Sequence, residues 1–203
     1  MHDIEIRARL RVSLTREFDQ NSIILDEMPV PGHAARIDVA VVNGELHGFE
    51  IKSDADTLKR LASQQIAYSA LFDRLTLVVG ERHYVAAMEI IPDWWGVRVA
   101  RSGSSELAIE REAQGNSLVD PSVLVRLLWK HEVLNLLEWY GFSISVKRQY
   151  AYERNKMLIE AVSLTSLKAA VRDTIKLREH WRPGALRTPC GAETQPASRL
   201  RDR

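Results

Sequence analysis

The chain contains very little cysteine and no long apolar run, and each absence excludes a class of protein. Cys190 is the single cysteine among 203 residues, so neither an intrachain disulfide nor a cysteine-based zinc site can form. No apolar run reaches the roughly eighteen residues of a membrane span. The first residues, Met1 to Glu5, lack the basic and then apolar layout of a secretory signal. We therefore expect a cytoplasmic protein that does not cross a membrane.

Two common catalytic motifs are also missing. The chain has no Gly-rich phosphate-binding loop and no Gly-x-Ser-x-Gly nucleophile turn. Its composition, 45% hydrophobic and 27% charged, is ordinary for a globular protein, and 203 residues suffice for one core with a small appended module.

The net charge of +1 hides a strong asymmetry along the chain. Residues 1–141 hold 15 Lys and Arg against 21 Asp and Glu, a formal charge of −6, whereas residues 142–203 hold 13 against 6, a charge of +7. A basic segment beside an acidic one suits a protein that contacts phosphate and also binds a cation. A solvated basic helix face is an equally good interpretation of the same residues: Lys147, Arg148, Arg154, Lys156, Lys168, Arg172, Lys176, Arg178 and Arg182.

The N-terminal half alternates helical and strand patterns. The predicted elements are helix 3–16, strands 22–30, 36–42 and 46–53, helix 57–72 and strand 75–79. Asn43-Gly44, between the second and third strands, is a strong hairpin signal. The apolar run at 75–79 is typical of a buried central strand. This order, αβββαβ, predicts an α/β fold with a mixed central sheet flanked by helices.

The second half reads as mostly helical. Helix 84–91, a turn at 92–93 and strand 95–101 complete the predicted core, and helices 121–140 and 163–181 form a basic C-terminal extension. Residues 183–203, rich in Pro, Gly, Ala and Arg, are predicted to be a disordered tail. We thus divide the chain into a core (1–101), a helical extension (102–182) and a tail (183–203).

Three ionisable residues interrupt the apolar strands of the hairpin. Glu50 and Lys52 alternate with Ile51 and therefore point to the same face of their strand, and Asp38 lies on the neighbouring strand, within reach of Glu50. Burying these groups costs several kcal/mol unless they pair or bind a metal. A surface ion-pair cluster is the alternative explanation. We interpret the three as a candidate catalytic site.

The residue types suit phosphodiester hydrolysis. Two carboxylates, Asp38 and Glu50, are ligands that Mg²⁺ or Mn²⁺ prefers, and such an ion acidifies a bound water. Lys52 would position the attacking water and offset the developing negative charge.

Asp38 followed by Glu50-Ile51-Lys52 on a β-hairpin resembles the PD-(D/E)XK superfamily, which has the restriction-endonuclease-like fold. The proline that precedes the first aspartate in that superfamily is absent here, where Arg36-Ile37 stands instead. The stretch 36–79, with Pro-Asp-Trp-Trp-Gly at 92–96, also resembles an uncharacterised bacterial family placed in the superfamily. The resemblance implies that the backbone carbonyl of Ile51 is a further metal ligand.

Other residues extend the resemblance. Glu5 lies in the first helix, where many members carry an additional acidic residue near the metal, so it is a candidate ligand. Glu27 is another open candidate. Gln64 and Tyr68 form Gln-x-x-x-Tyr on one helix face, as in nucleases similar to the RecB nuclease domain, and would support the substrate or brace the site.

The resemblance implies a Mg²⁺-dependent deoxyribonuclease, an endonuclease or exonuclease acting in restriction, repair or mobile-element defence. Its expected partner is nucleic acid, with DNA favoured over RNA, and a homodimer stays open because many members cut both strands as dimers. Two other classes stay open as well: a nuclease-fold module without activity that binds nucleic acid, and one that binds a protein partner.

Overall fold

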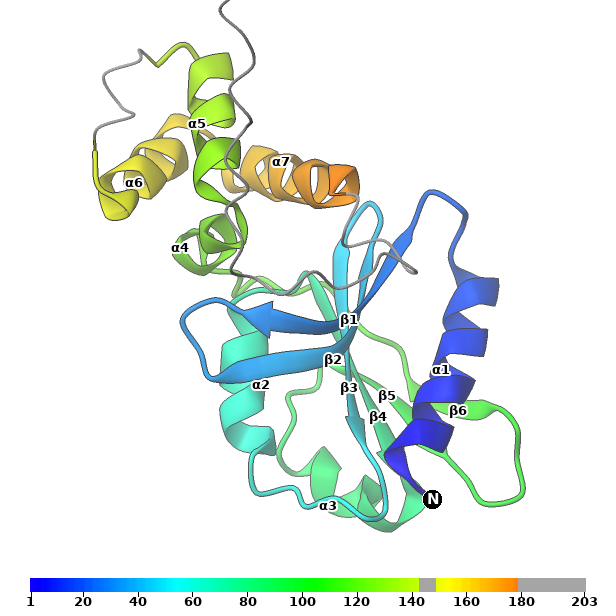
Figure 1. Cartoon of the computed structure of the whole chain (residues 1–203). Coiled ribbons are helices and arrows are strands. Elements are labelled where there is room, and N and C mark those ends of the chain that lie inside the picture. The colour runs from blue at the N-terminus through cyan, green and yellow to red at the C-terminus, as the bar shows by residue number, and fades with distance from the viewer. Residues whose placement is uncertain (143–148, 179–203) are drawn as a thin grey trace, which may run out of the picture.

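The computed structural model describes residues 1–142 and 149–178, which form a six-stranded sheet with helices on both faces (Figure 1). In chain order the elements are α1 (Asp3–Glu17), β1 (Ile23–Val30), β2 (Ala35–Val42), β3 (Leu46–Lys52), α2 (Leu61–Ser69), β4 (Arg74–Gly80), the 3-10 turn η1 (Glu81–His83), α3 (Tyr84–Met88), β5 (Gly96–Ala100), β6 (Leu107–Arg111), α4 (Pro121–Leu124), the 3-10 turn η2 (Val125–Leu127), α5 (Lys130–Trp139), α6 (Ala151–Ala161) and α7 (Leu164–Leu177). The strands stand in sequence order, with β3, β4 and β5 parallel and the other neighbours antiparallel. The predicted α/β class with a mixed sheet is confirmed.

The central strands are buried on both faces because their odd and even positions are both largely apolar. On one face, Ile6, Leu10 and Leu14 of α1 pack against strand residues such as Phe49 and Ile51. On the other face, α2, α3 and α7 contact β2 and β4. Since strand side chains alternate, Glu50 and Lys52 of β3 point to the α2 face, opposite α1.

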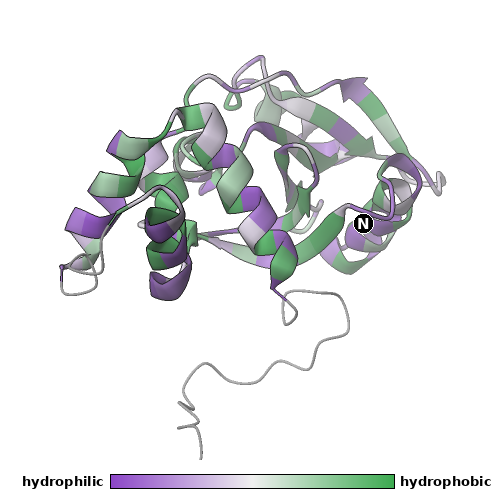
Figure 2. Cartoon of the chain, turned by 90° about the horizontal axis from the view of Figure 1, so that it is seen from above, coloured by the Kyte–Doolittle hydropathy of each residue, from purple (hydrophilic) through white to green (hydrophobic). Residues whose placement is uncertain are grey.

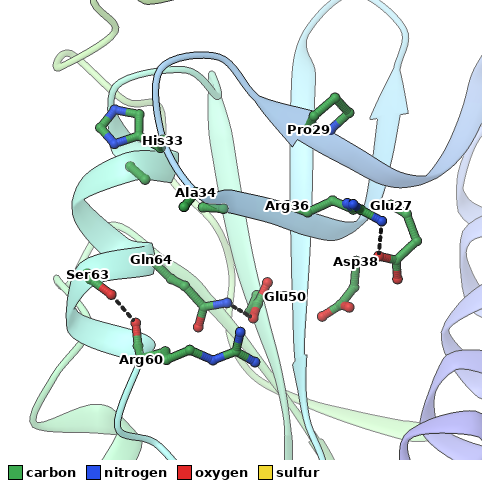
Figure 3. Close-up of a pocket in the computed structure, with 12 residues that line it drawn as sticks. Glu27, Pro29, His33, Ala34, Arg36, Asp38, Glu50, Arg60, Ser63 and Gln64 are labelled. Atoms are coloured by element: carbon green, nitrogen blue, oxygen red, sulfur yellow. Dashed lines mark hydrogen bonds and ion pairs between the residues drawn. The ribbon is translucent and has the colours of Figure 1, made fainter. Parts of the chain in front are cut away.

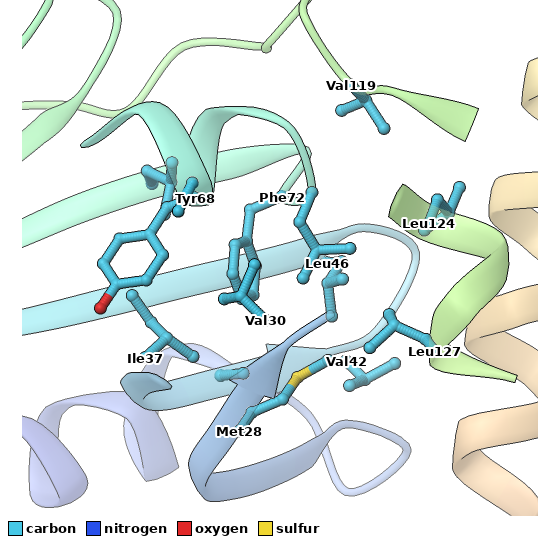
Figure 4. Packing of buried hydrophobic residues seen from close by; sticks show 14 of the residues in the cluster. Met28, Val30, Ile37, Val42, Leu46, Tyr68, Phe72, Val119, Leu124 and Leu127 are labelled. Atoms are coloured by element: carbon cyan, nitrogen blue, oxygen red, sulfur yellow. The ribbon is translucent and has the colours of Figure 1, made fainter. Parts of the chain in front are cut away.

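One apolar core runs from α2 to the helices of the C-terminal half. Figure 4 shows Tyr68 at one end of this cluster, Phe72 in its middle, and Leu124 and Leu127 at the other end. The sheet also extends beyond the predicted core boundary at residue 101, because β6 pairs with β5. The C-terminal helices therefore share the core of the sheet.

Several predicted boundaries are wrong, and each has a local cause. The helix predicted at 57–72 spans only Leu61–Ser69, because the Asp56 carboxylate accepts hydrogen bonds from the Ser53 N–H and hydroxyl and closes a turn before it. The helix predicted at 121–140 breaks where Leu128 and Trp129 adopt extended conformations. The helix predicted at 84–91 ends at Met88.

Two elements were not predicted at all. Strand β6 lies at the sheet edge and is largely exposed, so it lacks an apolar signal. Helix α6 buries little more than Arg154 and Leu158, so its apolar signal is weak. The predicted tail at 183–203, with Cys190, lies outside the described residues, as do the last residues of the helix predicted at 163–181.

The helices carry alternating hydrophobic and hydrophilic residues in Figure 2, as expected for elements with one buried and one exposed side. Within residues 1–142 and 149–178, no helix is long and apolar enough to span a bilayer.

Candidate active site

Strands β2 and β3 separate at the predicted site. Their backbone pairing ends at Val39 and Phe49, and beyond this point Asp38 Oδ2 accepts the Ile51 N–H at 2.7 Å. The N–H and C=O of one strand residue point to the same edge, so the Ile51 carbonyl also points into this opening. The opening therefore gathers a carboxylate and a backbone oxygen between two strands.

Glu50 stands beside this opening and is held by three side chains. It is 1% exposed, and its Oε1 contacts the Lys52 ammonium and accepts a hydrogen bond from Gln64 Nε2 at 2.6 Å. The Tyr68 hydroxyl donates to its Oε2 at 2.9 Å. Gln64 also donates to the Tyr68 hydroxyl at 3.1 Å. The structure thus brings four of the predicted site residues into one contact network.

The electrostatics of the two carboxylates differ from those of exposed acids. Burial, and then the nearby Asp38 charge, raise the pKa of Glu50 to about 7, although Lys52 and Tyr68 oppose the shift. Burial also raises the pKa of Asp38, against the Ile51 N–H and the charges of Arg7 and Lys52. It is unfavourable for two neighbouring carboxylates to be ionised at the same time. A bound cation would offset their charge, so the site favours a cation.

Arg7, rather than Glu5, is the α1 residue at the site. Its guanidinium donates to the Asp38 carbonyl at 2.9 Å and to Asp38 Oδ1 at 2.8 Å, and it pairs with Glu27 at 3.2 Å. Glu5 is exposed, and its carboxylate accepts the His2 N–H at 2.9 Å at the start of the helix. The structure does not bring Glu5 to the site, because Ile6 faces the sheet and turns Glu5 outward.

Glu27 lies opposite Asp38, between the paired positions Asp26–Val39 and Met28–Ile37. Its φ of 54° is the single positive value among non-glycine residues in the described part of the chain. An L-residue in this region costs on the order of 1–3 kcal/mol, and such strain is concentrated at functional sites. No pattern in the sequence marks this conformation.

An open pocket of about 750 Å³ lies over the two carboxylates, between the β1–β2 hairpin and α2 (Figure 3). Asp38 and Glu50 line it together with Glu27, and two arginines, Arg36 and Arg60, contribute the opposite charge. The remaining lining residues are Pro29, His33, Ala34, Ala35, Ser63, Gln64 and Ala67. The sequence did not single out Arg60, because the predicted helix 57–72 placed it inside a helix.

Gln64 carries a buried acceptor without a partner. The residue is 8% exposed, and its Oε1 makes no hydrogen bond within the described structure. Exchanging the amide oxygen and nitrogen would put an acceptor against the Glu50 carboxylate, so the nitrogen is correctly placed facing Glu50. A buried acceptor of this kind usually serves a water, an ion or a ligand.

No cluster of three or more His, Cys, Asp or Glu side chains arranged to hold a metal occurs within residues 1–142 and 149–178. The oxygen donors that converge here are two carboxylates, the Ile51 carbonyl and the Gln64 amide. An oxygen-only set of this kind matches the preference of hard divalent cations.

Most basic residues of the C-terminal helices are already paired. Lys168 and Arg172 of α7 pair with Asp73 at 2.8 and 3.4 Å. Lys156 pairs with Glu160, while Arg154 and Arg178 are buried. Lys147, Arg148 and Arg182 lie outside the described residues. The described part of the extension therefore provides few cations for a phosphate surface.

Tyr68→Phe tests whether Tyr68 braces the Glu50 carboxylate, and should not unfold the protein. The hydroxyl that it removes hydrogen-bonds Glu50 and opposes the rise of the pKa of Glu50. We expect a loss of stability of about 1 kcal/mol and an affinity for Mn²⁺ at pH 7 that is several-fold lower. Calorimetric titration checks this, with Tyr84→Phe, a tyrosine on α3 outside the pocket, as control. Equal affinities for the two variants would contradict a bracing role for Tyr68.

Comparison with known proteins finds similarity to a solved structure, to a phage protein and to one family. A solved protein of unknown function from Silicibacter pomeroyi is 22% identical and aligns over 69% of this chain and 91% of its own, with a TM-score of 0.41. Protein cII of Enterobacteria phage P4 is 30% identical over 162 residues, which are 79% of this chain and 61% of that protein. The chain thus spans about three fifths of the length of this relative. Residues 5–185 match the family described as Bacteriophage P4 protein cII, and the chain belongs to this family.

Proposed function

We propose that the protein is a metal-dependent nuclease that hydrolyses DNA phosphodiester bonds at the pocket over Asp38 and Glu50. The observation that carries the proposal is the convergence of Asp38, Glu50 and Lys52 at one opening between β2 and β3. Buried ionisable groups on an otherwise apolar face are costly, and such a cost is typical of functional sites.

Asp38, Glu50 and the Ile51 carbonyl would hold Mg²⁺ or Mn²⁺. Their all-oxygen chemistry fits a hard divalent cation. When bound, such an ion lowers the pKa of a water and offsets the charge of the phosphate.

The chain itself supplies orientation and charge. The Lys52 ammonium, which contacts Glu50, would hold the attacking water and stabilise the negative charge that develops on phosphate. Gln64 and Tyr68 hold the Glu50 carboxylate in one orientation. The Glu50 side chain is therefore already ordered before the substrate binds, and its ordering adds no cost to the reaction.

The same residues favour a restriction-endonuclease-like core for the mixed sheet, with α1 and α2 on opposite faces of the hairpin. The similarity to a protein of phage P4 favours a role connected with mobile elements over restriction or repair. Endonuclease action by a homodimer is the form that we propose for cleavage of both strands.

A second candidate function is a nuclease-fold module that binds nucleic acid or a protein partner without cleaving. One observation favours it: Arg7 and the Ile51 N–H occupy both carboxylate oxygens of Asp38. A metal would have to displace the Arg7 guanidinium from Asp38, and a protein without metal would keep this pair.

Thermal unfolding with Mn²⁺ separates the two functions. At a free concentration a hundred times Kd, binding stabilises by about 2.7 kcal/mol, which corresponds to a Tm increase of roughly 5 to 10 °C. Asp38→Asn should abolish the increase. Asp26→Asn is the matched control, because Asp26 also pairs with arginines of α1 but does not line the pocket. A wild-type Tm that Mn²⁺ leaves unchanged would favour the module without activity.

A further inference from the structure

We propose that the beginning of α2 is a phosphate-binding subsite, in which Arg60 holds a backbone phosphate of the nucleic-acid strand beside the carboxylates. The inference deepens the proposed function and rests on it for the identity of the ligand. It concerns the wall of the pocket formed by α2, whereas the metal ligands come from β2 and β3.

Arg60 is exposed and immediately precedes α2, and its side chain extends along the pocket past Gln64 toward the carboxylates (Figure 3). Its guanidinium has no hydrogen-bond or ion-pair partner among residues 1–142 and 149–178. The other arginine that lines the pocket, Arg36, approaches Glu27 at 3.6 Å. Arg60 is thus the pocket arginine whose charge is free for a ligand.

The local backbone also favours an anion. Helix α2 has nine residues, its Arg60 N-cap makes no side-chain cap hydrogen bond, and its first turn contains no acidic residue. The Leu61 N–H donates to the Leu58 carbonyl at 2.9 Å, while the N–H groups of Ala62 and Ser63 have no acceptor within the described residues. Helix N-termini of this kind attract negative charge through the helix dipole.

The unpartnered Gln64 Oε1 supplies an independent indication of a ligand. It is buried in the same pocket and requires a hydrogen-bond donor. A phosphate group offers acceptors, whereas a nucleotide unit of a DNA strand offers a phosphate together with base N–H donors. Arg60 and Gln64 together therefore match a nucleotide within a strand.

The charge of the pocket shows why Arg60 is needed. Three carboxylates and two arginines line it, so a phosphate that approaches without a metal meets a net negative surface. Four basic residues of the described C-terminal region already pair with carboxylates: Lys156, Lys168, Arg172 and Arg178. Arg60 therefore gives this wall of the pocket a positive charge that no carboxylate among the described residues engages.

The test is fluorescence anisotropy with a labelled single-stranded DNA oligonucleotide in EDTA, so that cleavage is not required. Arg60→Gln should weaken binding about tenfold and make the plot of log K against log salt less steep by about 0.7, the loss of one phosphate contact. Lys59→Gln is the matched control: Lys59 is the neighbouring exposed cation in the same loop and does not line the pocket. Arg60→Lys keeps the charge and should restore the salt dependence.

Equal effects of Arg60→Gln and Lys59→Gln, or no effect of either, would overturn the subsite. Cleavage by wild type with Mg²⁺ is scored separately. If the wild type cleaves DNA and Arg60→Gln binds DNA as tightly as the wild type, the nuclease function is supported and the subsite is rejected. If the wild type does not cleave DNA, and Arg60→Gln weakens DNA binding whereas Lys59→Gln does not, the subsite is supported and the catalytic role is rejected.

Discussion

Lys52→Ala is expected to lower the rate of DNA cleavage at saturating Mg²⁺ by about a thousandfold, the loss typical of removing one preorganised group that stabilises transition-state charge. The ammonium contacts Glu50 Oε1 and is 5% exposed, so the substitution removes a positive charge from a site where water screens little. The measurement is single-turnover cleavage of plasmid DNA under saturating enzyme.

Two further variants separate catalysis from folding. Lys52→Met preserves most of the buried volume and should lose the same activity while it stays folded at the assay temperature, which circular dichroism checks. Lys59→Ala removes an exposed lysine outside the pocket and should cut at the wild-type rate. Wild-type activity in both Lys52 variants would contradict the role of Lys52 in the reaction.

The metal-free protein is expected to lose stability as pH rises from about 4.5 to about 7. Glu50 has an ordinary pKa of 4.5 when unfolded and a pKa of about 7 in the folded state, so in this range the folded protein binds more protons than the unfolded chain. The stabilisation is complete below the unfolded pKa and is lost as pH rises through the folded pKa. The total is up to about 3 kcal/mol.

Urea unfolding in EDTA across pH 5 to 8 measures this loss. Glu50→Gln cannot titrate, so the difference in unfolding free energy between wild type and this variant should change across the interval and flatten above it. Metal binding should reverse the trend, because it requires the ionised carboxylate and strengthens as pH rises toward 7. Parallel pH profiles for the two proteins would contradict a raised Glu50 pKa.

The arrangement of the central residues could be predicted because it follows from strand geometry. Glu50 and Lys52 share a face since they are two residues apart, and the three-residue loop 43–45, which contains the predicted Asn43-Gly44, closes the hairpin that brings Asp38 beside them. These relations depend only on residues that are close in the sequence and on one turn.

The role of α1 could not be predicted because it depends on how the helix is rotated. Ile4 and Val12 are apolar residues of α1, but they are 76% and 52% exposed. The buried stripe is Ile6, Leu10 and Leu14, and this rotation brings Arg7 rather than Glu5 to Asp38. The apolar residues at every fourth position were the signal in the sequence for which side of α1 faces the sheet.

The pocket wall at α2 depends on where that helix begins. The turn closed by Ser53 and Asp56 delays the helix start to Leu61 and leaves Arg60 at its N-terminus. A side-chain hydrogen bond of this kind competes with helix formation and is difficult to weigh from sequence. The positive φ of Glu27 depends on long-range packing and has no local signal.

The most direct measurement is the anomalous difference density of crystals soaked in Mn²⁺. The proposed function predicts a peak in contact with Asp38, Glu50 and the Ile51 carbonyl, with the Arg7 guanidinium withdrawn from Asp38 Oδ1. Crystals soaked in saturating Mn²⁺ that show no peak there, and in which Arg7 still hydrogen-bonds Asp38, would contradict it.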